Sequence, residues 1–569
     1  MALLGWQIVF AQNTMPITIY VAKKIITMNP AQPEATAVAV KDHRIYSVGS
    51  LKEMQSWMKS GTYQVDNTFT NQVITPGLIE AHCHWTLIAA VMSHPYVGYW
   101  DFPGPNGTVF HGIKTHQGVI DYLKAEDKKL TDPNQLLFAW NYDPTFLNNQ
   151  ELTAADLDTV SKTRPIFVLN ASDHIAYVNS VLLNKGGYSA ETNIPGVEKG
   201  PDGKPTGALK EFAAMMPILD SIYLDLFESK SYTQNLYGAA DTAHRLGLTT
   251  VSDLFFGGAG ENTLINNLKQ AANDPKYPLR TVLVYNGELL YQLEKKSPGA
   301  GVAHLNSLIQ QNSNNLNFGA VKFISDGSIQ GFTARIKWPG YFNGARNGIF
   351  NMTTDELKTT ALPFWKAGFP IHVHTNGNEA TDSVLDVLDY LQTTIPRKSN
   401  IFVVEHNQMA SPEQFRRLRH LGGYVNLFPN WIYFWGDLSY HNLLGPDRAN
   451  YMDDVAEAKR QRIIFSIHTD SPVTPLGPLH SMWAAVNRMT SSGRVLGPSQ
   501  RVSPIDALRA VTLNAAYLLN LQNEIGSIEV GKRADFTVLG QDLETVNAQS
   551  IKDIPVVATI QNGTVFSVK

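Results

Sequence analysis

The sequence has little of what several protein classes depend on. Cys83 is the one cysteine among 569 residues, which excludes an intrachain disulfide and a structural zinc site built from several cysteines. No run approaches the roughly 20 apolar residues of a membrane-spanning helix. The formal net charge is −4, so the chain offers no basic field for a nucleic acid or a phospholipid surface. We therefore expect a globular protein with neither a nucleic acid nor a membrane as its partner.

The start of the chain leaves the compartment open. Residues 1–12 contain an apolar stretch, and Val9-Phe10-Ala11 resembles the small-residue pattern of a signal-peptide cleavage site. However, no Lys or Arg precedes Lys23, whereas a secretory signal begins with basic residues. The protein is expected in the cytoplasm or, if residues 1–12 are the remnant of a signal peptide, in the periplasm or outside the cell.

Apolar, strand-like segments alternate with helical segments over most of the chain. Helices are predicted at 231–246, 354–367, 378–393, 412–421 and 503–521. Strands are predicted at 73–84, 248–255, 280–287, 319–327, 369–377, 400–407, 423–429 and 462–470. Eight apolar strands that alternate with helices predict an α/β fold, in which parallel βα units close into a (β/α)8 TIM barrel.

Three stretches do not fit the barrel. The segment after the first strand is too long for a simple crossover and has strand-like runs of its own, while both ends of the chain show short alternating strands with Gly and Asn turns. The predicted division is a small β-sandwich built from residues 1–74 and 525–569, the first barrel strand in 75–88, an inserted domain in 89–230 and the rest of the barrel in 231–524.

Polar residues of the barrel strands lie at their carboxyl ends, where barrel enzymes place their active sites. These residues are His82 and His84 on the first strand, Lys322 on the fourth, His374 on the fifth, His406 on the sixth and Asp470 on the eighth. Side chains alternate along a strand, so the two histidines of the first strand should face the same way and Cys83 the opposite way. Any one of these histidines could be a core or surface residue, but their joint placement predicts a divalent metal site. Zinc is the default occupant, and Mn, Fe, Co and Ni are alternatives.

Several motifs together carry a family resemblance. The segment "TPGLIEAHCH" resembles the metal-binding signature of the amidohydrolase superfamily. The segments "VKFISDGSIQGFTA", "HTNGNEA", "VEHNQ", "HTDSPVTPLGPL" and "GSIEVGKRADFTVL" resemble its YtcJ-like branch, which includes N-substituted formamide deformylase. The resemblance runs from about residue 16 to the C-terminus. It implies a metal-dependent hydrolase with a barrel, a terminal β-sandwich and an insertion after the first strand.

The resemblance also implies roles for single residues. His82 and His84 would bind the more buried of one or two ions, and His374 and His406 the second. Lys322 would be carboxylated and bridge the two ions, because an unmodified lysine cation cannot be a ligand. The alternative for Lys322 is an ion pair with a neighbour such as Asp326, and His372 could replace His374 as a ligand.

Further residues are candidates for the chemistry. The resemblance implies that Asp470 holds the attacking water and shuttles its proton to the leaving group. His174 of the insertion and His468 of the eighth strand could contact the substrate or stabilise an oxyanion. Each could instead be structural. Two aromatic loops, residues 96–105 and 428–437, would either line an apolar pocket over the metal or pack the insertion against the barrel.

The expected activity is hydrolysis of a non-peptide C–N bond, in an amide, N-acyl or N-formyl group of a small, partly apolar molecule. A metal-dependent esterase or lactonase is the alternative within enzymes, because the same activated water attacks esters. A catalytically silent barrel with a binding role is the alternative outside them. A homodimer is compatible with the sequence, which decides neither the oligomeric state nor the substrate.

Overall fold

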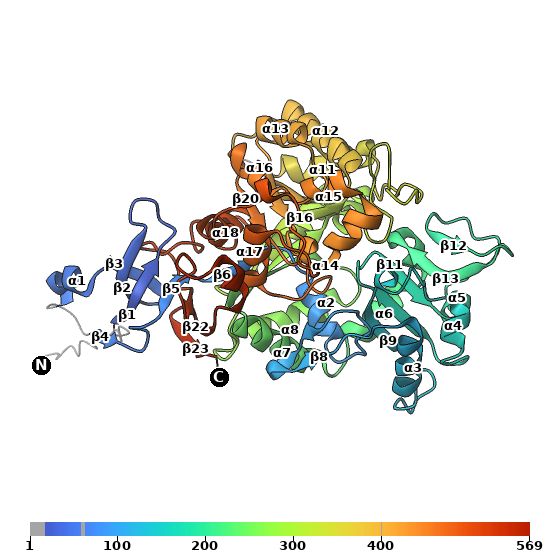
Figure 1. The fold of residues 1–569 in the computed structure, drawn as a ribbon, viewed down its shortest axis with the longest axis horizontal. Helices are drawn as coiled ribbons and strands as arrows, with labels where there is room; N and C mark the ends of the chain where they lie inside the picture. The colour runs from blue at the N-terminus through green and yellow to red at the C-terminus, as the bar shows by residue number, and fades with distance from the viewer. Residues whose placement is uncertain (1–16, 59–62, 400, 569) are drawn as a thin grey trace, which may run out of the picture.

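The computed structural model describes residues 17–58, 63–399 and 401–568. The segment interpreted as a signal-peptide remnant, residues 1–12, lies outside the described residues. Figure 1 shows three parts side by side: a sheet from the two ends of the chain at the left, a barrel in the middle and an insertion at the right. The barrel therefore contacts both of the other parts.

The barrel is a parallel sheet of eight strands that pair in chain order. They are β6 (Leu78–Glu80), β14 (Leu248–Phe256), β15 (Arg280–Asn286), β16 (Leu316–Ile324), β17 (Ile371–Thr375), β18 (Phe402–His406), β19 (Tyr424–Leu427) and β20 (Phe465–Ile467). Just past β6 and β20, Asp470 N donates to His82 O at 3.1 Å and His84 N donates to Ser471 O at 2.8 Å. These hydrogen bonds join the first and last strands, and the predicted (β/α)8 barrel is confirmed.

Helices surround this sheet. They are α2 (Trp85–Val91), α7 (Tyr232–Arg245), α8 (Glu261–Asn273), α9 (Gly287–Lys296), α10 (Ala300–Ile309), α11 (Thr354–Lys366), α12 (Asn378–Thr394), α13 (Pro412–His420), α14 (Asn430–Leu438), α15 (Pro446–Tyr451), α16 (Val455–Arg460), α17 (Pro478–Asn487), α18 (Pro504–Ala510) and α19 (Leu513–Leu518), with short turns at Ser439–Leu443 and Pro498–Gln500. Ser411 caps α13 and accepts a hydrogen bond from the backbone nitrogen of Gln414.

The single long helix predicted for 503–521 is wrong. It is two helices, α18 and α19, which are separated at Val511 and Thr512. Val511 O accepts a hydrogen bond from Ile79 N of the first barrel strand, at 2.8 Å, and Thr512 adopts a non-helical conformation. The break therefore arises because the barrel strand takes the carbonyl that a continuous helix would have used.

Strands from both ends of the chain form one continuous sheet. It contains β1 (Ile17–Ile26), β2 (Glu34–Lys41), β3 (Arg44–Gly49), β4 (Tyr63–Asp66), β5 (Val73–Pro76), β21 (Phe536–Leu539), β22 (Val556–Gln561) and β23 (Thr564–Ser567), with helix α1 (Leu51–Met58) and the turn Ala548–Asp553 beside it. Residues of both ends, among them Tyr20, Ile74 and Phe536, share one buried core. The two ends therefore fold as one unit.

This sheet extends further along the chain than the predicted boundary after residue 74. Thr75 and Pro76 pair with Thr537 and Phe536 in the terminal sheet, and the barrel strand begins at Leu78. Gly77 lies between the two sheets, where a Cβ atom would be 2.1 Å from Thr249 Oγ1. The boundary is therefore set by a close approach that requires a glycine.

The insertion has a five-stranded sheet of its own. Its strands are β9 (Leu137–Tyr142), β10 (Ile166–Asn170), β11 (Ile175–Val178), β12 (Val197–Lys199) and β13 (Pro205–Lys210), beside the hairpin β7 (Phe102–Pro103) and β8 (Val109–Phe110). Its helices are α3 (His116–Asp127), α4 (Ala154–Asp158), α5 (Ser180–Lys185) and α6 (Glu211–Phe227), with turns at Pro105–Gly107 and Pro144–Phe146. The strand-like runs expected in this segment include β9, at one edge of the sheet, and its neighbour β10.

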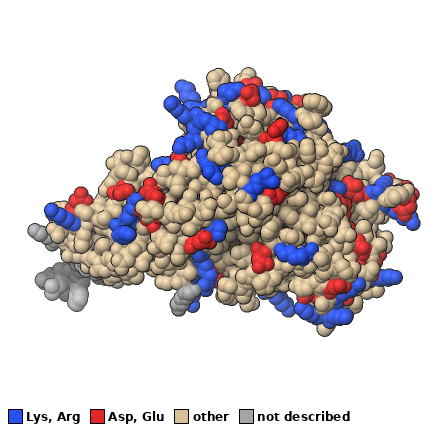
Figure 2. Space-filling model, in the orientation of Figure 1, with Lys and Arg blue, Asp and Glu red and all other residues tan. Residues whose placement is uncertain are grey.

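Charges of both signs are interspersed on the face of the molecule that Figure 2 shows. No large area of that face carries Lys and Arg alone, which agrees with the near-neutral net charge of the chain. Among the described residues, no helix is long and apolar enough to cross a membrane.

Candidate metal centre

The histidine pair lies just past a barrel strand rather than in it. β6 ends at Glu80, His82 lies in a bend, and His84 precedes α2. The expectation that His82 and His84 lie on one face of a β-strand is therefore wrong, because both residues lie beyond the end of β6. The two imidazoles nevertheless face one carboxylate, because their Nε2 atoms lie 3.2 Å and 3.5 Å from Asp470 Oδ1. The hydrogen bonds between the ends of β6 and β20 produce this arrangement.

Four of the predicted residues converge at the carboxyl end of the barrel. His82, His406, His468 and Asp470 are buried, and their potential ligand atoms all lie within 4.8 Å of one another. The ring of His468 stacks on that of His82 with 4.7 Å between centroids, and the ring of His406 lies 4.6 Å from that of His82. His468, which was predicted to contact the substrate, therefore belongs to the group that could bind a cation.

The remaining predicted ligands border this group. The ring of His374, on β17, lies 4.5 Å from that of His406. Lys322, on β16, places its Nζ 3.5 Å from His82 Nε2. His84 completes the set through its contact with Asp470. The fold thus brings the predicted ligands to one end of the barrel, and their division between one or two ions stays a prediction.

Lys322 is buried, and the carboxylates of Glu405 and Asp470 act on it through their charges without forming an ion pair. Among the described residues no carboxylate forms an ion pair with it, and burial lowers its pKa from the usual value to about 8. The alternative partner, Asp326, instead accepts backbone hydrogen bonds from Arg335, Asn376 and Gly377, each 2.9 Å long. The predicted alternative of an ion pair between Lys322 and Asp326 is therefore wrong.

A carboxylate that the sequence analysis missed lies beneath the centre. Glu405 accepts hydrogen bonds from Nδ1 of His82 and Nδ1 of His372, both 2.6 Å long, and from Asn426 Nδ2 at 2.8 Å. An ionised carboxylate can only accept, so both imidazoles carry their proton on Nδ1 and direct Nε2 away from Glu405. Burial opposes ionisation, but the hydrogen bond from His372 and the charge of Lys322 hold the pKa of Glu405 below its usual value.

The backbone at His406 explains how two consecutive side chains reach the centre. His406 has a φ of 64°, and Asn407 N donates to Glu405 O at 2.8 Å around it. In a regular strand Glu405 and His406 would point to opposite faces. The left-handed turn removes this alternation, at a cost of about 1–3 kcal/mol that the surrounding structure must offset.

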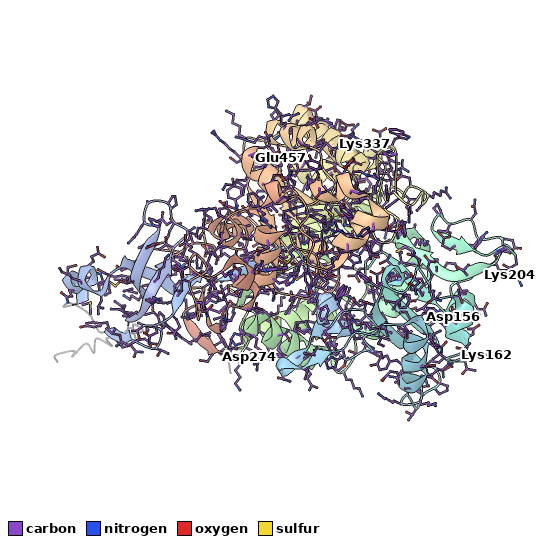
Figure 3. The ribbon with its side chains drawn as sticks, in the orientation of Figure 1. Asp156, Lys162, Lys204, Asp274, Lys337 and Glu457 are labelled. Carbon is purple, nitrogen blue, oxygen red and sulfur yellow. The ribbon has the colours of Figure 1, made fainter. Side chains whose placement is uncertain are left out.

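The insertion contributes a second imidazole–carboxylate pair. His174, next to β11, lies with its ring 4.8 Å from that of His374, and Glu211 of α6 is 2.8 Å from its Nδ1. Figure 3 labels three charged residues of the insertion, Asp156, Lys162 and Lys204, and all of them lie at its outer edge. The structure therefore places His174, which was predicted to contact the substrate, beside the candidate metal centre.

The cluster has the properties of a cation site. Burial lowers the pKa of His82, His374 and His406 well below the usual value, and that of His468 to about 4, so these rings are neutral with a lone pair to donate. In the described part of the chain, neither ring nitrogen of His406 or His468 has a hydrogen-bond partner. Buried polar atoms without partners are costly unless a ligand satisfies them. A divalent metal bound by these nitrogens and by Asp470 would do so.

Burial opposes the ionisation of Asp470, yet its pKa lies below the usual value because the imidazole of His84, whose Nε2 is 3.5 Å from Oδ1, and the charge of Lys322 favour the carboxylate. The same contact raises the pKa of His84 despite its burial. Asp470 is therefore available as an anionic ligand and proton acceptor at neutral pH.

A cavity of about 390 Å³ adjoins the cluster on the side of His84. Asp253 of β14 lies beside His84 in its wall, and the aromatic part of the lining consists of Phe212, Tyr223, Phe227 and Phe255. The exposed side chains of Met216, Asp220 and Gln292 also line it, so the cavity opens to the surface there. A small molecule in this cavity would lie against the imidazole that faces Asp470.

The two aromatic loops that the sequence singled out are not part of this cavity's lining. Trp100 and Phe434 pack with ring centroids 5.6 Å apart, and Phe146 packs on Trp435 at 5.8 Å. These contacts hold the insertion against α14 of the barrel. Of the two alternatives for these loops, packing of the insertion against the barrel is therefore the correct one. Phe428 is an exception, because its ring stacks on that of His468 with 4.9 Å between centroids.

Cys83 has no part in the cluster. It is fully buried in the main core, where its Sγ contacts Ser252 O at 2.8 Å and burial raises the pKa of its thiol. We expect Cys83→Ser to bind metal as tightly as the parent protein, because the hydroxyl can donate to the same carbonyl. Titration with zinc against a chelator measures this, and a loss of bound metal in this variant would make Cys83 a ligand.

Comparison with known proteins finds relatives that match most of the chain. The chain is 25% identical over 541 residues to N-substituted formamide deformylase of Arthrobacter pascens, covering 93% of this chain and 94% of that protein. It is 23% identical to the amidohydrolase YtcJ of Bacillus subtilis, with coverage of 95% and 97%. A metal-dependent hydrolase from Pyrococcus horikoshii has the same fold, with a TM-score of 0.70 at 19% identity, covering 94% of this chain and 99% of that one.

The family model settles the relationship. The model of the amidohydrolase family matches residues 70–566, which include the barrel, the insertion and, of the terminal sheet, β5, β21, β22 and nearly all of β23. The resemblance inferred from the motifs is thereby confirmed, and the protein belongs to the amidohydrolase family.

Proposed function

We propose that this protein hydrolyses a non-peptide C–N bond in an amide, N-acyl or N-formyl group of a small molecule. The observation that carries the proposal is the convergence of buried imidazoles on the Asp470 carboxylate, beside a cavity large enough for a small molecule. The similarity to N-substituted formamide deformylase supports an amide rather than an ester as the substrate.

The donor set fits a divalent cation. His82, His84, His374, His406 and Asp470 would hold one or two ions, with zinc as the default, and His468 offers a further nitrogen. When bound, such a cation is a Lewis acid that lowers the pKa of water from ~15.7 towards about 7 and polarises a carbonyl group. The chain's own side chains then have to move protons and position the substrate.

Asp470 is the residue proposed to move the proton. Its carboxylate would accept a proton from the attacking water and deliver it to the leaving nitrogen. Nδ1 of His174 donates a hydrogen bond to Glu211, whose charge raises the pKa of the ring although burial lowers it, so a protonated Nε2 would donate to the substrate carbonyl. His468 would contribute as a ligand or as a support for Asp470, to which it is adjacent in the cluster.

A panel of paired substrates tests this proposal. Zinc-loaded protein is assayed on amides, formamides and esters that share the same two substituents. Faster turnover of the amides and formamides is the expected result. A preference for the esters would favour the alternative of an esterase or lactonase, and no turnover of any pair by metal-loaded protein would favour a binding role.

Carboxylation of Lys322 is a separate part of the proposal. A lysine with a pKa of about 8 has an appreciable neutral fraction near neutral pH, and only the neutral amine can react with CO2. We expect reconstitution with zinc to be faster with added bicarbonate, and Lys322→Ala to lose this dependence. Mass spectrometry of the intact protein should show the mass of one CO2, and bicarbonate-independent reconstitution would contradict the modification.

A further inference from the structure

From the cavity beside His84 we infer a binding site for an organic cation, an alkylammonium group carried by the substrate. The inference rests on the proposed function in one respect: the cation is taken to be a part of the molecule that is hydrolysed. It goes further than that function because it names a charge and a shape that the substrate must have.

The first observation is the aromatic lining. Phe212 and Phe255 lie with ring centroids 5.2 Å apart, and Tyr223 and Phe227 lie 5.3 Å apart. Aromatic faces attract cations, and quaternary ammonium ligands are recognised by pockets built from several such rings. Phe212 also lies 6.1 Å from His174, which links these rings to the metal centre.

The second observation is the charge of the wall. The lining contains the carboxylates of Asp220, Asp253 and Glu288 but neither a lysine nor an arginine. A bound anion would face these carboxylates without a countercharge, whereas a cation would be attracted by them. A substrate with a free carboxylate beside its acyl nitrogen, such as an N-acyl amino acid, is therefore a poor match for this cavity.

The third observation concerns which carboxylate is free to bind a ligand. Asp253 is already occupied, because Thr86 donates to it from its backbone nitrogen at 2.7 Å and from its hydroxyl at 2.5 Å. The Glu288 carboxylate has no hydrogen bond or ion pair with any other part of the described chain, and burial raises its pKa. An ammonium group beside Glu288 would supply the missing partner.

Glu288 is held in a fixed place. It lies in the first turn of α9, where Asn286 Oδ1 accepts hydrogen bonds from the backbone nitrogens of Glu288 and Leu289, at 2.9 Å and 3.4 Å. Tyr223 and Phe227 come from α6 of the insertion and Phe255 from β14 of the barrel. The site is thus built between the barrel and the insertion.

The test uses a pair of probes with the same shape and different charge. Zinc-loaded protein is titrated by calorimetry with choline and with the alcohol in which carbon replaces the choline nitrogen. We expect choline to bind about tenfold more tightly, which corresponds to about 1.4 kcal/mol. The carboxylic acid of the same shape, tert-butylacetate, should compete with neither.

Two variants locate the site. Glu288→Gln should reduce the preference for choline about fivefold, and Tyr223→Leu should reduce it by a similar factor. The matched control, Glu413→Gln on the far helix α13, should leave it unchanged. Equal binding of the two probes, binding of neither, or an unchanged preference in Glu288→Gln would each overturn the inference. Selective choline binding without hydrolysis of any amide or ester would overturn the proposed function and leave the cation site standing.

Discussion

Asp470→Asn is expected to lower kcat by about 10²–10⁴ while the protein keeps its metal. The asparagine oxygen can still occupy the position near His82 and His84, whose Nε2 atoms lie 3.2 Å and 3.5 Å from Asp470 Oδ1. It cannot take up a proton, because an amide has no basic site near neutral pH. The hydrolysis step should therefore be slowed, whereas the variant should still bind metal and substrate.

The measurement separates these two effects. Metal content is determined on the purified variant, and kcat and KM are determined on the best amide of the substrate panel. Asp447→Asn, at an exposed position at the start of α15, is the control for the same change of charge. Full activity in Asp470→Asn would show that another group moves the proton. Loss of the metal would show that Asp470 acts chiefly as a ligand.

The sequence predicts the fold and much of the site because both depend on local patterns. Eight apolar strands separated by helices are enough to predict a barrel. Polar residues at the carboxyl ends of those strands then have to meet, whichever loops connect them. His374, His406 and Asp470 could be placed in this way although nearly 100 residues separate the first from the last.

The residues that the sequence analysis missed depend on tertiary structure. Glu405 precedes His406 directly, and strand alternation would direct it away from the site. The left-handed conformation of His406, with a φ of 64°, reverses this expectation, and nothing in "VVEHN" indicates it. The aromatic wall of the cavity is a similar case, because Tyr223 and Phe255 belong to different parts of the chain and meet only through domain packing.

The separation of Cys83 from His82 and His84 is predicted correctly, but for an incorrect reason. Cys83 was expected to face away from His82 and His84 because of the pleat of a strand. No strand exists there, since β6 ends at Glu80. The separation arises because the backbone of Cys83 pairs with β14, where Leu254 N donates to Cys83 O at 3.0 Å and the thiol contacts Ser252 O. The predicted ligands still converge after this correction, but their arrangement depends on the hydrogen bonds between the ends of β6 and β20.

Glu405→Gln is expected to weaken metal binding by about 10–100-fold, the usual effect of removing a carboxylate that orients a histidine ligand. Glu405 accepts a hydrogen bond from His82 Nδ1 and another from His372 Nδ1, both 2.6 Å long. A glutamine has one acceptor oxygen and one amide group, so one of the two imidazoles would face a donor instead of an acceptor. That ring would have to rotate or change its tautomer, and His82 would lose the arrangement that presents Nε2 to the cation.

Competition with a chelator measures this effect directly, without relying on activity. Glu457→Gln is the matched control: Glu457 is also a largely buried carboxylate with two side-chain partners, Arg460 and Gln461, but it lies on α16 at the outside of the barrel, where Figure 3 labels it. We expect this control to bind zinc as the parent protein does. If Glu405→Gln also retains the parent affinity, then the bend at His82 and its contact with Asp470 suffice to orient the ring. The carboxylate beneath the centre would then serve only to satisfy buried donors.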